Sequence, residues 1–161
     1  MARPLLPSHV MLVETVFQYR TLIGKCELGV GLEMDEIEIV QRIEEMFAAE
    51  RADGRKFRRQ VVEMPGIMRG DMINDRVDVI EIGPGGLVCR DAPFVAKGEI
   101  IEIVIEDAQN SYRFRARGVW LREDGDHYRV GLAFEGMPVC LHKVQISPHT
   151  HDVVDKIANA A

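Results

Sequence analysis

The spacing of apolar residues divides the chain into a helical part and a strand-forming part. In the first fifty residues apolar side chains recur every three to four positions, as they do along one face of a helix. This spacing predicts a first helix over about residues 9–23, with Ser8 as its N-cap and Gly24 as its stop. The apolar face of this predicted helix carries Leu12, Val16, Tyr19 and Ile23.

A second helix is predicted to follow Asp35. Asp35 and Glu38 form a D-x-x-E variant of the capping box, and Met34 is placed to pack onto Ile39. The predicted apolar stripe consists of Ile37, Val40, Ile43 and Phe47, and the predicted water-facing side carries Glu36, Glu44 and Glu45. Two short amphipathic helices do not bury both stripes alone. We expect them to pack on the rest of the chain, on each other, or on a second subunit in a homodimer, and the pattern leaves these alternatives open.

From residue 60 the period changes from helical to strand-like. Apolar and polar residues alternate in six segments, at about residues 60–68, 76–82, 87–90, 99–106, 111–121 and 127–134. One face of the fifth segment is predicted to carry Tyr112, Phe114, Ala116, Gly118 and Trp120. Short turns such as Asp124-Gly125 favour antiparallel pairing, and closure into a barrel would remove exposed edges. Pro148 and Asp152 then introduce a predicted short helix that ends near residue 159.

Composition narrows the class of protein. The chain has 161 residues, of which 47% are hydrophobic and 29% charged, as expected for one soluble globular domain with an appendage. No apolar run approaches the roughly 18 residues of a membrane span, and the first residues do not form a secretory signal. Cys26, Cys89 and Cys140 are widely spaced, which favours reduced thiols in a cytoplasmic protein over a zinc site or disulfides.

Charge is unevenly distributed. The formal net charge of -6 argues against general DNA or RNA binding, which depends on cationic residues. Residues 51–59 nevertheless hold five basic side chains against Asp53 alone. A compact cationic segment on an acidic chain suits a small anion better than a duplex, and the alternative is a solvated linker.

Two short motifs connect this cationic segment to a known family. Arg55 and Arg59 have R-x-x-x-R spacing, and the turn at 81–86 carries Glu81, Gly83 and Gly86 at the spacing of a D/N-x-S-x-x-G motif. Together with residues 128–134, which resemble the last strand of that family, these features resemble the PilZ domain. The resemblance covers about residues 51–136. It implies a mainly β fold, a small antiparallel β-barrel. Periodicity and capping signals add an N-terminal helical appendage at 1–50 and a C-terminal tail and helix at 137–161.

The resemblance also implies a ligand, the second messenger cyclic di-GMP. Arg55 and Arg59, with Arg58 as an alternative register, would contact guanine edges and phosphates, for which the planar guanidinium is suited. Gly86 keeps the last position of the second motif, but Glu81 replaces Asp or Asn and Gly83 replaces Ser. Losing one or two polar contacts at about 0.5–3 kcal/mol each would weaken binding by about tenfold to several hundredfold.

Other candidate sites have simpler interpretations. A cationic stripe is predicted on one strand face, at Arg113, Arg115 and Arg117. It is either a surface for a protein partner or the solvent-facing side of a sheet, where the arginines would pair with Glu102 and Glu106. The glycines at 83–86 lack the following helix and lysine of a phosphate loop, so we expect a tight turn. The histidines have no familiar ligand spacing and are expected on the surface, at His142, His149 and His151.

The sequence therefore predicts a protein without catalytic activity. No nucleophile or zinc-enzyme motif is present, and no cofactor is expected beyond cyclic di-GMP as a candidate ligand. The resemblance implies a regulatory adaptor that binds a protein partner, in bacterial motility or surface behaviour, with weak or absent cyclic di-GMP binding. The alternatives are a functional cyclic di-GMP receptor that uses Arg55 and Arg59, and a barrel enzyme or flavin-binding barrel of similar pattern. No membrane insertion is expected.

Overall fold

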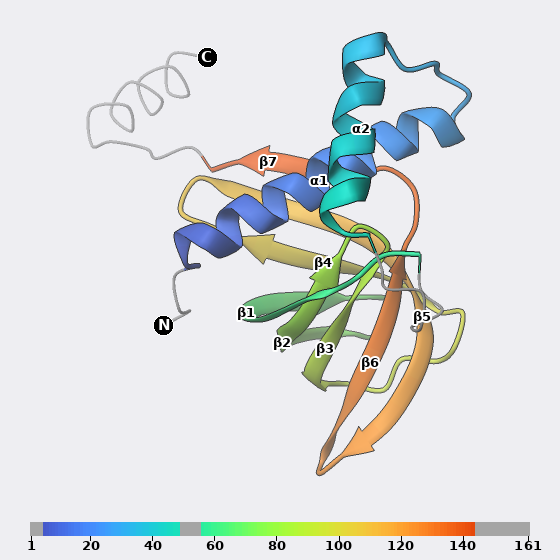
Figure 1. The fold of residues 1–161 in the computed structure, drawn as a ribbon. Helices are drawn as coiled ribbons and strands as arrows, with labels where there is room; N and C mark the ends of the chain where they lie inside the picture. The colour runs from blue at the N-terminus through green and yellow to red at the C-terminus, as the bar shows by residue number, and fades with distance from the viewer. Residues whose placement is uncertain (1–4, 49–55, 144–161) are drawn as a thin grey trace, which may run out of the picture.

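A computed structural model describes residues 5–48 and 56–143 (Figure 1). This part of the chain contains two helices followed by seven strands. The helices are α1 (Pro7–Glu27) and α2 (Met34–Met46). The strands are β1 (Gln60–Arg69), β2 (Asn74–Gly83), β3 (Gly86–Ala92), β4 (Ile100–Glu106), β5 (Asn110–Asp124), β6 (His127–Phe134) and β7 (Val139–His142). The predicted C-terminal helix falls outside the described residues.

Helix α1 begins earlier and ends later than the sequence predicts. Pro7 lies in its first turn, where a missing N–H costs nothing, and Leu6 rather than Ser8 is the N-cap. The predicted stop at Gly24 is also wrong, because Gly24 is buried inside the helix and a Cβ there would lie 2.9 Å from Cβ of Met137. Glycine at this position lets α1 approach the segment after β6. The helix ends before Gly29, whose φ of 81° is the left-handed conformation typical of a helix terminus.

Helix α2 is capped by different residues from those predicted. The Glu36 side chain accepts a hydrogen bond from the backbone N–H of Glu33, the N-cap residue, at 3.1 Å. The predicted pair Asp35 and Glu38 therefore lies two residues too late. Met34 is 76% exposed, so the predicted packing of Met34 onto Ile39 is absent.

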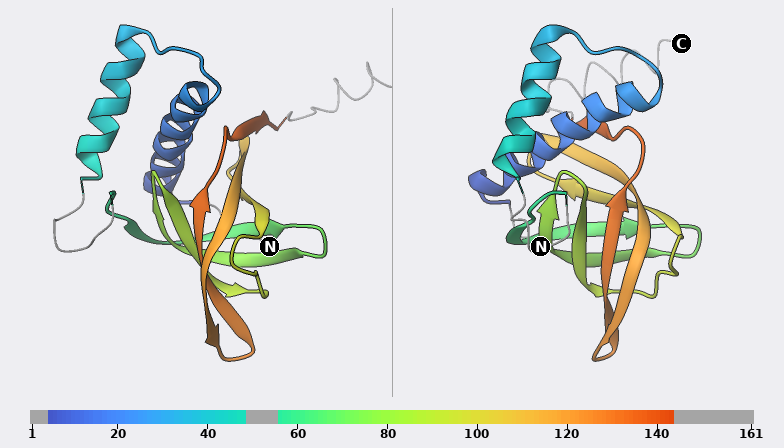
Figure 2. Two further views of the ribbon diagram at one scale, coloured as in Figure 1. Left: turned by 90° about the vertical axis from the view of Figure 1, so that its right-hand side faces the viewer. Right: turned by 45° about the vertical axis from the view of Figure 1, so that its right-hand side comes forward.

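The strands form a closed antiparallel barrel, as predicted. Neighbouring strands follow the order β4-β1-β2-β3-β6-β5, and pairing of β4 with β5 closes the ring of six. The six predicted segments correspond to β1 through β6 with boundaries shifted by at most three residues. Strand β7, which the sequence pattern did not predict, pairs with the start of β5 through Val139–His142. Figure 2 shows α1 lying across one end of this barrel.

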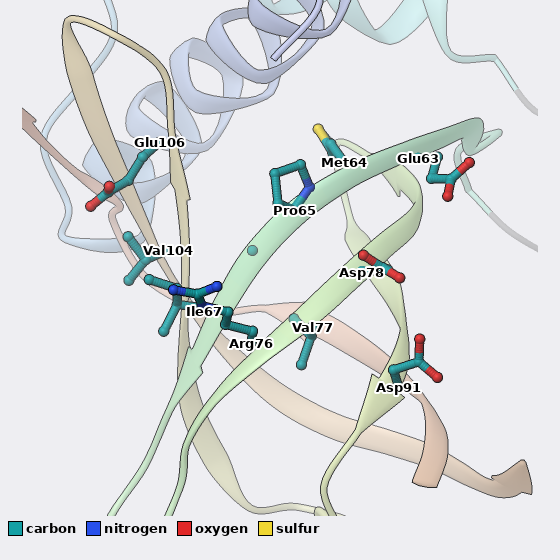
Figure 3. A pocket seen from close by; sticks show the side chains of 11 residues that line it. Glu63, Met64, Pro65, Ile67, Arg76, Val77, Asp78, Asp91, Val104 and Glu106 are labelled. Atoms are coloured by element: carbon teal, nitrogen blue, oxygen red, sulfur yellow. The ribbon is translucent and has the colours of Figure 1, made fainter. Parts of the chain in front are cut away.

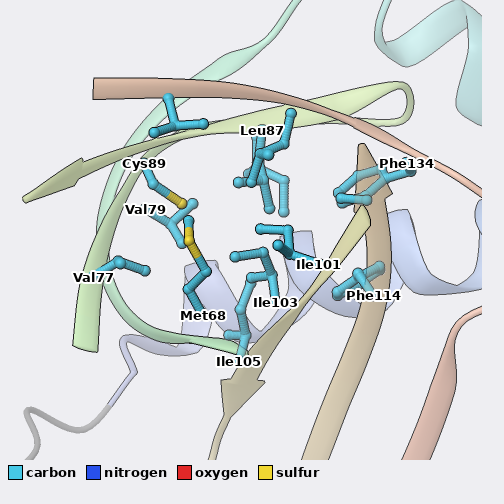
Figure 4. Close-up of a cluster of buried hydrophobic side chains, with 14 of the residues drawn as sticks. Met68, Val77, Val79, Leu87, Cys89, Ile101, Ile103, Ile105, Phe114 and Phe134 are labelled. Carbon is cyan, nitrogen blue, oxygen red and sulfur yellow. The ribbon is translucent and has the colours of Figure 1, made fainter. Parts of the chain in front are cut away.

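The barrel interior is filled by apolar side chains from all six strands. Figure 4 shows Met68, Val79, Leu87, Ile103 and Phe114 pointing into it. Val13 and Val16 of α1 belong to the same cluster and are fully buried. Helix α1 thus covers apolar positions at one barrel end that would otherwise face water.

Helix α2 packs mainly on α1. Its Ile43 and the following Phe47 join Tyr19 of α1 in a second buried cluster, with Phe57 packed against it. The two helical stripes therefore pack within one chain, on the barrel end and on each other, except that Ile37 near the start of α2 is exposed. In the described residues, neither helix has the length and apolarity needed to cross a lipid bilayer.

Trp120 is the one residue of the predicted inner face of β5 that lies elsewhere. The β5–β6 register shifts between Gly118 and Trp120, which places Trp120 opposite Gly131. A Cβ at Gly131 would collide with the indole ring, so Trp120 packs across Gly131. Leu132 and Val130 on either side of Gly131 belong to the core, so Gly131 and Trp120 face outward.

Candidate functional site

The arginine segment, which we define as residues 56–59, connects α2 to β1. The backbone N–H of Arg58 donates to the carbonyl oxygen of Phe47 at 2.8 Å. The guanidinium Nη2 of Arg58 donates to the carbonyl oxygen of Met46, the last residue of α2, at 3.3 Å. A cation at a helix C-terminus satisfies unpaired carbonyls and the helix dipole. Arg58 therefore ties the segment to α2, whereas Arg55 lies outside the described residues.

Phe57 fixes the same segment to the helical pair. Its ring packs edge-on against Tyr19, with centroids 5.6 Å apart and planes at 78°. Tyr19 in turn donates a hydrogen bond from its hydroxyl to Glu44 of α2 at 3.0 Å. Burial, reinforced by this bond to a carboxylate, raises the pKa of Tyr19 well above the ordinary tyrosine value. The hydroxyl therefore stays protonated, and one tyrosine joins α1, α2 and the arginine segment.

The glycine turn between β2 and β3 lies directly beneath the arginine segment. Gly83 and Gly86 face each other across the hairpin, and Gly83 is buried. A Cβ on Gly83 would lie 3.0 Å from the carbonyl oxygen of Arg58 and 3.4 Å from Cγ of Arg59. The two motifs that lie twenty residues apart in the sequence are thus in contact. The ligand-binding role of these residues stays a prediction.

Gly86 has a structural role of its own. A Cβ at this position would collide with the carbonyl oxygen of Leu132 on β6. Gly86 pairs with Ala133, the next residue along β6, so glycine permits two paired strands to approach at this turn.

Glu81 lies on the outer face of the barrel, close to the turn. It is half-buried and faces Val61 on β1 and Val88 on β3. Val88 faces Gly131, which Trp120 covers. Trp120 was predicted on the inner face and not as a neighbour on this outer face. Gly131 was the feature of the sequence that could have indicated this contact, since an aromatic residue commonly covers a glycine on the adjacent strand.

The predicted cationic stripe is present on β5, but its partners differ from those expected. Arg117 Nε lies 2.7 Å from Glu135. The expected partners of the stripe pair elsewhere in the described residues: Glu102 lies 4.0 Å from Arg69, and Glu106 lies 3.1 Å from Lys143. Arg115 is exposed and Arg113 is half-buried, so the cationic character of the stripe at the surface comes mainly from Arg115.

Metal-ligating residue types do not converge in the described part of the chain. No group of three or more His, Cys, Asp or Glu residues there could hold a metal ion. His142 is exposed on β7, and His149 and His151 lie outside the described residues. Cys89 is fully buried in the core, and burial raises the pKa of its thiol, which keeps the thiol protonated and unreactive.

Comparison with known proteins gives one result that agrees with this geometry. No match to the chain is found among the curated proteins. The PilZ domain family, a family of cyclic di-GMP-binding type, matches residues 53–146, more than half of the chain. That range begins just before the arginine segment and includes the whole barrel and β7. The chain is therefore a member of the PilZ domain family.

Proposed function

We propose that this protein is a non-catalytic regulatory adaptor that acts in the cytoplasm through a protein partner and binds cyclic di-GMP weakly or not at all. In this proposal it serves bacterial motility or surface behaviour, with residues 1–50 as a helical appendage to the barrel domain at 51–136. The observation that carries the proposal is the environment of Gly83. The carbonyl oxygen of Arg58 lies 3.0 Å from the position of a Cβ on Gly83, so a side chain at residue 83 would press against the arginine segment.

The surroundings of Gly83 affect both parts of the candidate nucleotide site, the second motif and the arginine segment. A complete second motif has a serine hydroxyl at the position of Gly83, and Gly83 supplies none. The side chain of Arg58, which could replace a motif arginine, donates instead to the end of α2. A ligand that binds the Arg58 side chain would break this hydrogen bond, which contributes about 0.5–1.5 kcal/mol to the stability of the fold. The missing serine hydroxyl and the bond that holds Arg58 to α2 both reduce the expected affinity for cyclic di-GMP.

The second candidate is a functional cyclic di-GMP receptor that uses Arg55 and Arg59. It is favoured by the contact between Arg59 and the glycine turn, which brings one motif arginine to the second motif. Glu81 on the adjacent outer face would then accept hydrogen bonds in place of the usual Asp or Asn, one methylene further out.

Calorimetric titration with cyclic di-GMP separates the two candidates. A full-motif receptor that binds near 1 µM would reach about 10–100 µM after losing about 1.4–2.8 kcal/mol. We therefore expect a dissociation constant above about 10 µM for this protein. Binding below about 1 µM that disappears in the Arg55→Ala/Arg59→Ala double variant would overturn the adaptor proposal.

The same double variant provides a test in cells. If the protein acts through a partner and independently of the nucleotide, the variant should restore motility to a deletion strain as well as the wild type does. Its melting temperature serves as the control, because Arg59 is half-buried and its removal can change the stability of the fold as well as ligand binding. Loss of activity at an unchanged melting temperature, with measurable nucleotide binding by the wild type, would favour the receptor.

A further inference from the structure

A groove of about 600 Å³ runs along the outer face of β1 and β2, away from the glycine turn. Figure 3 shows that its two ends differ in chemistry. Glu63, Asp78 and Asp91 lie at one end, and Ile67 and Val104 lie at the other, with Pro65 between them.

The apolar part of the groove exists because two strands separate there. Strands β1 and β4 pair only where Ile67–Arg69 meets Glu102–Val104. Pro65, two residues before this pairing begins, has no N–H to extend the ladder, and a proline on a strand edge blocks addition of another strand. The apolar side chains of Pro65 and Ile67 are only partly covered by the barrel itself. They form a floor on which another chain's apolar side chain can pack.

The acidic end has more carboxylates than cations. Nη2 of Arg90 lies 3.4 Å from Glu63 and 3.5 Å from Asp78, and its Nε lies 3.9 Å from Asp91. Asp78 and Asp91 thus share one guanidinium with Glu63, so the two aspartates alone exceed the charge of Arg90 by one. The far end is closer to neutral, since Arg76 lines it and Glu106 pairs with Lys143 at 3.1 Å.

An irregularity near the end of β3 places Asp91 at this acidic end of the groove. Pairing of β3 with β6 shifts register between Cys89 and Ala92, and Asp91 adopts a φ of 54°. A left-handed conformation is unfavourable for residues other than glycine, though aspartate and asparagine tolerate it best. Asp91 consequently lines the groove within 3.9 Å of the Arg90 guanidinium, instead of pointing to the opposite face as in a regular strand.

We propose that this groove binds an extended segment of a protein partner in which a lysine or arginine alternates with apolar side chains. The cation of the segment lies among Glu63, Asp78 and Asp91, and an apolar side chain packs on Pro65 and Ile67. The carboxylates repel phosphates, so the groove excludes nucleotides and nucleic acid. This inference names the partner chemistry of the proposed adaptor and rests on that function.

Titration of the isotope-labelled full-length protein with synthetic peptides, followed by nuclear magnetic resonance, tests the groove. Three ten-residue peptides with blocked ends serve as probes: alternating Lys and Val, alternating Glu and Val, and alternating Lys and Ser. We expect the Lys-Val peptide to shift amide signals of β1, of β2 and of Asp91, and to bind at least about tenfold more tightly than either other peptide. We also expect its affinity to fall as salt is added.

Variants locate the binding. Asp78→Asn with Asp91→Asn removes two charges but keeps side-chain shape, and asparagine tolerates the φ of residue 91. This pair should weaken Lys-Val peptide binding by at least about tenfold. Glu102→Gln on β4 is the matched control, because Glu102 is half-buried on the same outer face but does not line the groove, and it should leave affinity unchanged.

The inference would be overturned by equal binding of the three peptides, by signal shifts confined to α2 or β7, or by full affinity in the Asp78→Asn/Asp91→Asn variant. Absence of Lys-Val binding at millimolar peptide would also reject it. Neither substituted aspartate belongs to the nucleotide motifs. A failure here therefore differs from a failure of the adaptor proposal, which would show as tight cyclic di-GMP binding that depends on Arg55 and Arg59.

Discussion

The ring of Tyr19 on α1 packs edge-on against the ring of Phe57, which stands in the sequence between the two motif arginines Arg55 and Arg59. Phe57 also lies in van der Waals distance of the glycine turn, 3.7 Å from the position of a Cβ on Gly85. The helical pair, the arginine segment and the β2–β3 turn therefore meet at one aromatic side chain.

Phe57→Ala should separate the arginine segment from the helical pair. The ring is half-buried, so we expect a loss of about 2 kcal/mol in the free energy of unfolding, less than the 3–5 kcal/mol of a fully buried phenylalanine. Urea denaturation measures this loss. Lys56→Ala is the neighbouring comparison: its ammonium lies 5.2 Å from the centroid of the Phe57 ring at an exposed position, so its loss should cost no more than about 0.5–1 kcal/mol. Equal effects of the two substitutions would show that the aromatic contact contributes little.

Gly86→Ala should destabilise the barrel far more than Gly85→Ala. The new methyl group at residue 86 would meet the carbonyl oxygen of Leu132, which is held by strand pairing and cannot move independently. Overpacking against backbone costs about 3 kcal/mol or more. At Gly85 the nearest atom is 3.7 Å away, an ordinary contact, and the residue is exposed. Thermal unfolding of the two variants side by side checks the expectation, and a similar melting temperature for both would contradict it.

The barrel could be predicted from the sequence because alternation with period two is a direct consequence of strand geometry. Ile101, Ile103 and Ile105 of β4 point into the core as the alternation requires. The same rule placed Trp120 on the wrong face, since one register shift after Gly118 reverses every side chain that follows it. Such shifts depend on the paired strand and have no fixed signal in a single segment.

The errors in the helical part have a different cause. Gly24 has the sequence signature of a helix stop, but it lies inside α1 because Met137, more than a hundred residues away, needs the space. The sequence placed the motif arginines near the glycine turn through family resemblance. It could not reveal that Arg58 donates to the end of α2, because this contact depends on how the helical pair packs. At Gly24 and at Arg58, contacts with distant parts of the chain therefore determined the structure, and the local sequence did not reveal them.

The ion pair between Lys25 and Glu36 should make the joint of the two helices sensitive to acid. Lys25 Nζ lies 2.8 Å from the Glu36 carboxylate, and this hydrogen bond, with the backbone N–H of Glu33, holds the pKa of Glu36 below its ordinary value. A carboxyl with a lowered folded-state pKa stabilises the fold above its unfolded pKa of about 4.3 and loses that contribution as the pH falls through the folded value. The pKa of Lys25 is raised by the same bond, so its contribution is lost only in strongly alkaline solution.

Unfolding free energies measured between pH 7 and pH 3 test this linkage. The wild type should lose stability more steeply below about pH 4.3 than Glu36→Gln does, by a small margin because the pair is near the surface. Glu38→Gln, an exposed position on the same helix, is the control and should keep the wild-type slope. Parallel curves for the wild type and Glu36→Gln would contradict the expectation.

Restoring the second motif should recover nucleotide affinity if its missing groups cause the weak binding. Glu81→Asp with Gly83→Ser returns both side chains to the family pattern, and recovery of two polar contacts should raise cyclic di-GMP affinity by about 1–3 kcal/mol, or about fivefold to 150-fold. The φ of Gly83 is not in the left-handed region, so serine is compatible with the backbone there. Its Cβ would lie 3.0 Å from the carbonyl oxygen of Arg58, and the arginine segment would shift by a few tenths of an ångström.

Calorimetry on the double variant and on each single variant measures the recovery. Glu81→Asp alone avoids the close contact at residue 83 and should give a smaller gain without loss of stability. Gly83→Ser should lower the melting temperature modestly, because the segment between α2 and β1 moves to admit the new side chain. A folded double variant with unchanged affinity would show that the position of the arginine segment limits binding, since both motif side chains would then be present and still fail to hold the nucleotide.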